Sequence, residues 1–245
     1  MKHQGKIWQN MMLSLAIIIG AGSLTACNQS ENAATNLSNE EVAIVLEGAL
    51  SNGTQGISSE VNDLILLTQQ YAQKSVTNQY CGQSFDSTVV RNIDETRITA
   101  SYTATWKWKV NCNNLRIPTS LDFNRTSNGT YATARISSDD NAGSNWSIGN
   151  LLTGTAYTLN GTYTREGSQT TTIRNQNSFT SQVNISVNSL SVNKNTLRID
   201  SGTATFTLSG SGTDGNNFSY QGNIVFNGNG SATVTINGET FDIQL

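Results

Sequence analysis

The stretch Ser-Tyr-Thr-Ala-Thr-Trp-Lys-Trp-Lys-Val, residues Ser101–Val110, decides the fold. Its apolar side chains stand at every second position and polar side chains stand between them; the apolar set is Tyr102, Ala104, Trp106, Trp108 and Val110. Alternation with a period of two is typical of a β-strand with one buried and one solvent-exposed face. The stretch therefore predicts a half-buried strand whose tryptophans belong to the core face of a sheet.

The same alternation begins near residue 83 and continues to Leu245, punctuated by turns rich in glycine, asparagine and aspartate. Helical periodicity does not return between these segments, so neighbouring strands have short connections and no helical crossovers. The sequence thus predicts a mainly β fold of about ten or more strands in a large antiparallel meander sheet. A curved sheet, a sandwich and a partial barrel all fit this pattern.

Two amphipathic helices are expected before the sheet. Ser38 and Glu41 have the spacing of a capping box, in which each side chain bonds the backbone at the other position. Apolar residues follow at helical spacing until Asn52-Gly53, which ends the helix. A second apolar stripe runs from about Ser59 to Ser75. We expect both stripes to pack on the sheet; a partner or membrane surface is the alternative.

Two Asn-Gly dipeptides predict two-residue hairpin turns, because asparagine and glycine accept the positive φ angles of a type I′ turn. They are Asn128-Gly129 and Asn237-Gly238. The cross-strand pairs that follow are Leu121 with Ile136, Asp122 with Arg135 and Phe123 with Ala134, and near the C-terminus Ala232 with Ile243 and Val234 with Phe241.

Other positions predict irregular features of the sheet. The alternation continues through Asn160-Gly161, so we expect one long strand with a bulge or a close approach at Gly161. Pro118 predicts an edge strand or a bulge, because proline cannot donate a ladder hydrogen bond. Ser137–Asn150 is the longest segment without a clear period, and we expect it to be a loop.

The N-terminus has the features of an export signal. Lys2 and Lys6 precede an apolar run that ends in Leu24-Thr25-Ala26-Cys27. This tetrad resembles the lipobox of bacterial lipoproteins. The resemblance implies that residues 1–26 are a signal peptide and that Cys27 is lipidated, anchoring the protein to a membrane. An ordinary secretory signal, with Cys27 left as a thiol, is the alternative.

We expect the rest of the chain to divide into a flexible tether (27–38), a two-helix segment (39–76) and an antiparallel β domain (77–245) that forms one unit with the helices. Because Asn28, not aspartate, follows Cys27, the enterobacterial sorting pattern implies the outer membrane. The side of that membrane, periplasmic or external, stays open.

Composition argues against most enzyme chemistry. His3 is the single histidine and lies in the expected signal peptide, so the mature chain would lack the usual general base and zinc ligand. We expect no catalytic residues, no metal and no cofactor. The net charge is −3 and the basic residues are scattered, so nucleic acid is not an expected partner.

Cysteine usage predicts one disulfide. If Cys27 carries lipid, Cys81 and Cys112 remain in an exported chain, and an even number of cysteines there indicates pairing. The two cysteines also fall near one another if the strand from Ser84 to Arg91 pairs with the strand that ends at Val110. Two free thiols are the alternative.

A few residues are candidate ligand contacts. Trp106, Trp108 and Tyr102 offer aromatic faces to a sugar or a hydrophobic ligand, although their alternation favours the core. Trp146 is the expected exposed aromatic of a glycan site. Asp139 and Asp140 are candidate calcium ligands, but their loop lacks the EF-hand spacing and simple solvation of a turn is the alternative.

Three classes of function follow from these observations. The first is a lipid-anchored, non-enzymatic binding or structural module whose partner is a glycan or an envelope protein. The second is a periplasmic carrier of a hydrophobic ligand or lipoprotein, because helices packed in a curved sheet also build such carriers. The third is a glycan-active enzyme, which would need two carboxylates facing one another across a cleft.

Overall fold

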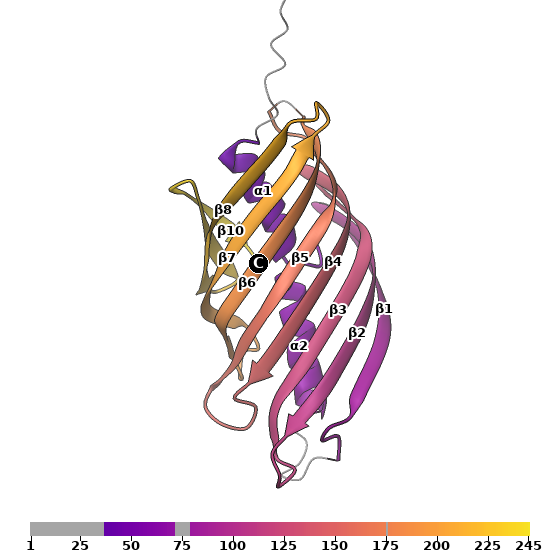
Figure 1. Ribbon diagram of the computed structural model, residues 1–245, viewed down its shortest axis with the longest axis vertical. Coiled ribbons are helices and arrows are strands. Elements are labelled where there is room, and N and C mark those ends of the chain that lie inside the picture. The colour runs from indigo at the N-terminus through magenta and orange to yellow at the C-terminus, as the bar shows by residue number, and fades with distance from the viewer. Residues whose placement is uncertain (1–36, 72–78, 175) are drawn as a thin grey trace, which may run out of the picture. The chain divides into compact units, whose positions relative to one another are not determined.

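The computed structural model in Figure 1 describes residues 37–71, 79–174 and 176–245. Two helices precede ten strands: α1 (Asn39–Leu50), α2 (Ile57–Tyr71), β1 (Ser84–Glu95), β2 (Ile98–Cys112), β3 (Pro118–Thr133), β4 (Ile136–Gly149), β5 (Ala156–Thr171), β6 (Ser178–Asn193), β7 (Ile199–Gly212), β8 (Asn217–Gly228), β9 (Ser231–Ile236) and β10 (Glu239–Gln244). The predicted mainly β fold is confirmed. The expected signal peptide and nearly all of the tether lie outside the described residues.

The ten strands form one antiparallel sheet in which each strand pairs with its neighbours in sequence, from β1 to β10. The sheet does not close on itself, so β1 and β10 are its two edges. In the described part of the chain, neither helix has the length and apolar character that a membrane-crossing helix needs.

Both helices cover one face of the sheet, which we call the inner face; the opposite face is the outer face (Figure 1). Side chains on every strand alternate between the two, and the inner positions supply the core together with both helices. Examples of fully buried inner residues are Phe123, Leu159, Leu208 and Val234. The predicted packing of the helices on the sheet is confirmed.

Helix α1 starts as the sequence predicts. The Ser38 side chain accepts a hydrogen bond from the Glu41 amide, and the Glu41 carboxylate accepts one from the Ser38 amide. The Glu41 carboxylate also accepts hydrogen bonds from the Thr171 hydroxyl and the Asn177 amide. The cap therefore ties the start of α1 to the end of β5. The predicted end of the second helix, residues 72–75, lies outside the described residues.

Three register predictions are confirmed. β1 and β2 form a hairpin around Thr96-Arg97, with Glu95 opposite Ile98. At the C-terminus Val234 pairs with Phe241 and Ala232 with Ile243. β5 runs through Gly161, and its pairing with β6 shifts there. A Cβ atom at Gly161 would lie 2.4 Å from the Trp146 ring, so this glycine permits a close approach of β4 and β5.

The predicted turn at Asn128-Gly129 is wrong, because both residues lie inside β3. The pairs expected from it are also wrong: Leu121, Asp122 and Phe123 lie opposite Ile148, Ser147 and Trp146. Gly129 is needed for another reason. It sits against the Tyr102 ring, where a Cβ atom would come within 2.6 Å of Cδ1. The turn is formed instead by Ala134-Arg135.

The expected loop at Ser137–Asn150 is wrong, because this segment forms most of β4. Small and polar residues occupy several of its inner positions, so the contrast between apolar and polar side chains is weak there. Pro118 lies at the bulge predicted for it, where the register shifts beside Cys112, but β3 is an interior strand and not an edge.

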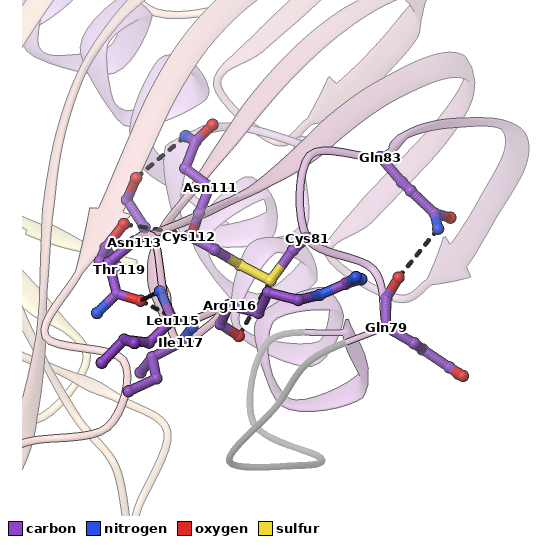
Figure 2. The surroundings of a disulfide bond; sticks show 11 residues. Gln79, Cys81, Gln83, Asn111, Cys112, Asn113, Leu115, Arg116, Ile117 and Thr119 are labelled. Carbon is purple, nitrogen blue, oxygen red and sulfur yellow. Dashed lines mark hydrogen bonds between the residues drawn. A yellow bond between two sulfur atoms is a disulfide. The ribbon is translucent and has the colours of Figure 1, made fainter.

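The predicted disulfide between Cys81 and Cys112 is present, with its two Cα atoms 5.5 Å apart (Figure 2). It joins the segment that leads into β1 to the end of β2. Beside it, the Asn113 side chain accepts hydrogen bonds from the amides of Leu115 and Ile117 and so orders the loop before β3. The start of β1 is therefore fixed covalently.

Candidate functional site

The aromatic residues that the sequence marks as ligand contacts lie on the inner face, under the helices. Tyr102 and Trp108 are buried, and Trp106 is half-buried. The Trp108 ring stacks on Phe85 and meets the Tyr71 ring of α2 edge to face. These aromatic faces pack against protein and are not open to a sugar.

Trp146 is not the exposed aromatic that the sequence analysis expects. It projects from the inner face of β4, only 3% of it is exposed, and its Nε1 donates a 2.8 Å hydrogen bond to Glu60 Oε2 in α2. Trp146 is buried because residues 137–149 form a strand and not a loop. In that strand it lies opposite Phe123 and points to the inner face.

Ion pairs between the inner face and the helices form a buried polar layer that the sequence analysis missed. Arg125 of β3 lies 3.1 Å from the Glu60 carboxylate, and both side chains are almost completely buried. Arg91 of β1 pairs with Asp63, one helical turn after Glu60. The sequence signal for this layer is an arginine at a core-facing position of a strand. Arg125, for example, stands four residues after the buried Leu121 and therefore points to the same face.

A second part of this layer surrounds Arg165 of β5. Its Nε lies 3.0 Å from Asp140 Oδ1, and its guanidinium donates to the carbonyl oxygens of Gly48 in the last turn of α1 and Thr54 in the α1–α2 connection. The Tyr102 hydroxyl donates to Asp140 at 3.0 Å. Arg165 thus holds the connection between the helices against the middle of the sheet.

Burial dominates the electrostatics of this layer. Desolvation raises the pKa of Glu60 even though the Arg125 charge and the Trp146 hydrogen bond act in the opposite direction. Desolvation likewise raises the pKa of Asp63 against the pull of Arg91. It raises the pKa of Tyr131 to about 12. These groups are closed off from solvent, so the layer fixes the helices and offers no access to a substrate.

The outer face has a different chemistry. Its side chains are mostly hydroxyls and amides, arranged in rows that cross the sheet from strand to strand. One such row consists of Thr103, Asn128, Asn141, Glu166, Gln182, Ser209 and Ser219. No described residue on this face is aromatic. Its large exposed hydrophobic side chains are Val90 and Val225.

Three neighbouring hollows lie on the outer face over β1 to β7, with volumes of about 610, 450 and 450 Å³. Asn141 and Glu166 line both of the smaller hollows, and Ser168 lines the largest hollow and one smaller one. Gly143 contributes to the depth of a smaller hollow, because it has no side chain between Thr126 and Thr164. The three hollows therefore adjoin one another through shared residues, and together we call them the outer hollows; hydroxyl, amide and carboxylate side chains are most numerous in their lining, and Ile93 and Ala132 add apolar surface to the largest hollow.

Asp139 and Asp140 point to opposite faces of β4. Asp139 is exposed at the outer hollows, whereas Asp140 is buried beside Arg165. The two carboxylates therefore cannot hold the same calcium ion. Within residues 37–71, 79–174 and 176–245, no three histidine, cysteine, aspartate or glutamate side chains gather closely enough to hold a metal ion.

Asp139 and Glu166 are the acidic residues at the centre of the outer hollows. Glu166 lies opposite Asn141 and Asp139 opposite Ser168, so the two carboxylates occupy diagonal positions on adjacent strands. Both are solvent-exposed. With the neighbouring amides and hydroxyls, they provide a dense set of hydrogen-bond acceptors and donors.

Comparison with known proteins adds no assignment to this site: no family model matches the sequence, and no curated protein and no solved structure is significantly similar to it.

Proposed function

We propose that this chain is a lipid-anchored protein of the bacterial cell envelope that binds a hydroxyl-rich glycan in the outer hollows and catalyses no reaction. The lipobox-like sequence at Leu24–Cys27 supports the anchor, and Asn28 directly after the cysteine supports an outer-membrane location. The observation that carries the binding proposal is the set of adjoining hollows whose lining residues are mostly hydroxyl, amide and carboxylate residues.

The chemistry of the hollows matches sugar hydroxyl groups. Asn141 offers two donors and an acceptor, Glu166 offers acceptors alone, and Ser168 offers both. Vicinal hydroxyls of a sugar both donate and accept, so this set can bond a sugar edge from several directions. The face has few charges and few apolar side chains, and the core of a protein–protein interface is usually richer in aromatic residues.

A carrier of a hydrophobic ligand has less support. Such a carrier needs a dry space between the sheet and the helices, lined by residues such as Tyr102 and Trp108. Those side chains instead contact Arg165 and Tyr71. An apolar ligand would have to displace helices that buried ion pairs hold in place.

The binding proposal is tested with the purified full chain and immobilised envelope polysaccharides, including peptidoglycan. Glu166→Ala and Asn141→Ala should each weaken binding about tenfold, as expected for the loss of one hydrogen bond to a charged or amide group. Ser186→Ala, an exposed outer-face change on β6 away from the outer hollows, is the matched control. Equal binding by all three variants would place the glycan elsewhere, and absence of binding to every polysaccharide would contradict the proposal.

The anchor and the location need separate measurements. Mass spectrometry of the mature N-terminus should find lipid on Cys27 as residue one. Protease treatment of intact cells and of cells with a permeabilised outer membrane then distinguishes an external domain from a periplasmic one. An N-terminus that starts elsewhere contradicts the anchor without affecting the binding test.

A further inference from the structure

The two edges of the sheet are not equivalent. β10 is short, and α1 covers it: the Asn39 side chain donates to Glu239, and the Ser51 hydroxyl donates to the Gln244 carbonyl. β1 is twice as long, at 12 residues, and runs along the open side of the sheet in Figure 1. Among residues 37–71, 79–174 and 176–245, the fold therefore covers one edge and leaves the other uncovered.

The backbone of β1 has an unused set of hydrogen-bonding groups. Because Thr96-Arg97 makes a two-residue turn, Glu95 and Ile98 form a hydrogen-bonded pair, and odd-numbered residues of β1 direct their backbone groups toward β2. The even-numbered residues, from Ser84 to Asp94, direct theirs away from the sheet. Among the described residues, β1 pairs only with β2, and no other backbone or side-chain group bonds its outward amides and carbonyls. An edge of this kind is a template for a further strand.

The side chains of β1 do not block such pairing along its length. Exposed edges usually carry charges or proline at their centre, but the centre of β1 is Thr88-Val89-Val90. Val90 is 64% exposed, the most exposed large hydrophobic side chain of the sheet. Its charged residues are Asp86, Arg91, Asp94 and Glu95; Arg91 follows Val90 directly, but its side chain pairs with Asp63 of α2 under the inner face.

We propose that β1 pairs antiparallel with β1 of a second copy of this chain, about a two-fold axis at Val89, so that two sheets join into one. This inference does not depend on the proposed glycan binding. A second copy is the proposed partner because the side chains of two β1 strands are complementary. A two-fold axis at Val89 sets Phe85 opposite Ile93, Asp86 opposite Asn92, and Ser87 opposite Arg91. Apolar residues meet apolar residues, and each charged residue faces a neutral one.

Neighbouring registers are worse on the same criteria. An axis at Val90 sets Asp86 opposite Asp94, and an axis at Arg91 sets two arginines opposite each other; like charges directly opposite are destabilising. An axis at Thr88 sets Phe85 opposite Arg91 and shortens the overlap. Each of these axes pairs even residues with even residues and so fits the hydrogen-bonding parity, and the side-chain pairs decide in favour of Val89.

The proposal is tested by sedimentation equilibrium of the full chain in density-matched detergent. A dimer is expected for the unchanged chain. Val90→Pro removes an outward amide that β2 does not use, and Val90→Lys places a charge at the centre of the edge. Each should raise the dissociation constant at least about tenfold, the effect of losing about 1.4 kcal/mol. Circular dichroism confirms that each variant is folded.

Val225→Lys is the matched control, since Val225 is also an exposed outer-face valine but lies on the interior strand β8. It should leave the dimer unchanged. A monomer at every concentration overturns the proposal, whether or not the edge accepts an extended peptide of another protein. A dimer that survives both changes at Val90 overturns it as well, because its interface then lies elsewhere.

Cross-linking tests the register. In the proposed pair the two Val89 residues form a non-hydrogen-bonded pair with Cα atoms about 4.5 Å apart, within the range of a disulfide. The two Val90 residues lie on a diagonal, about 8 Å apart and beyond that range. Val89→Cys should therefore oxidise to a covalent dimer about tenfold faster or more than Val90→Cys, with the unchanged chain as the blank. The opposite order would contradict the axis at Val89.

Discussion

The indole nitrogen of Trp146 in β4 donates a 2.8 Å hydrogen bond to Glu60 in α2, a carboxylate that also pairs with Arg125 of the adjacent strand β3. One helical side chain thus joins two strands. Since removing either member of a buried ion pair leaves the other charge unpaired, the loss of Arg125 or of Glu60 should destabilise the fold.

Arg125→Met is expected to lower the free energy of unfolding by about 3 to 5 kcal/mol at pH 7, because it leaves the Glu60 carboxylate buried without a counter-charge. The loss should be smaller at pH 4, where that carboxyl is protonated. Urea unfolding at both pH values measures it. Arg174→Met is the control: its pair with Glu40 is exposed, and its loss should cost at most about 1 kcal/mol. Equal losses of unfolding free energy in Arg125→Met and Arg174→Met would contradict the assignment of Arg125 and Glu60 to a buried ion pair.

Glu60→Gln leaves the Arg125 guanidinium buried without a counter-charge, and the pH dependence of its effect on stability has a defined sign. Burial raises the pKa of Glu60 above 4.5, so the folded protein binds this proton more tightly than the unfolded chain does. The stabilising contribution of Glu60 is therefore complete below pH 4.5 and is lost as the pH rises through its raised pKa. The free energy of unfolding of the wild type minus that of Glu60→Gln should fall from pH 4 upward. A difference that grows with pH contradicts this expectation.

The disulfide should stabilise the hairpin of β1 and β2. Replacing both Cys81 and Cys112 by serine opens a loop with a sequence separation of 31, for which chain entropy gives a loss of about 3 to 4 kcal/mol. Thermal unfolding of the double variant measures this loss. A reduced wild type should unfold at the temperature of the double variant; a higher value would mean that the serines themselves disturb the fold.

Two glycines on neighbouring strands should differ in how strongly their replacement by alanine lowers stability. Gly161→Ala directs a methyl group at the Trp146 ring and should cost about 1 to 3 kcal/mol through overpacking. Gly143→Ala adds its methyl group to the outer face, where the nearest atom is 3.4 Å away, and should change stability by less than about 0.5 kcal/mol. Comparable losses in the two variants would show that the outer hollows are not open at Gly143.

The sequence predicted the fold well wherever the two faces of a strand differ strongly in polarity. Ser101–Val110 is such a case, and so is the C-terminal hairpin, where valine and alanine alternate with threonine. Prediction failed at β3 and β4 because Arg125, Ser127, Asp140 and Ser144 occupy inner positions there. Polar residues at core positions hide the alternation of apolar and polar side chains. Without that alternation, the Asn128-Gly129 pair inside β3 was interpreted as a turn.

The candidate site was less accessible to sequence reasoning for a different reason. The outer hollows combine residues from several strands, and each residue alone is an ordinary polar residue of an exposed face. Only the register that sets Asn141 opposite Glu166 brings them together. The aromatic residues were predicted as ligand contacts. Their burial under the helices was missed because periodicity alone does not show where a helix packs on a sheet.

The contact between α1 and the last strand has a consequence for the order of assembly. Nine hairpin-like pairings form between neighbours in sequence, so the sheet can grow strand by strand as the chain emerges. Helix α1 emerges before any strand, yet Ser51 finds its acceptor only at Gln244. The contact between the end of α1 and β10 can therefore form only after every strand has emerged, although α1 is the first element of the fold to emerge.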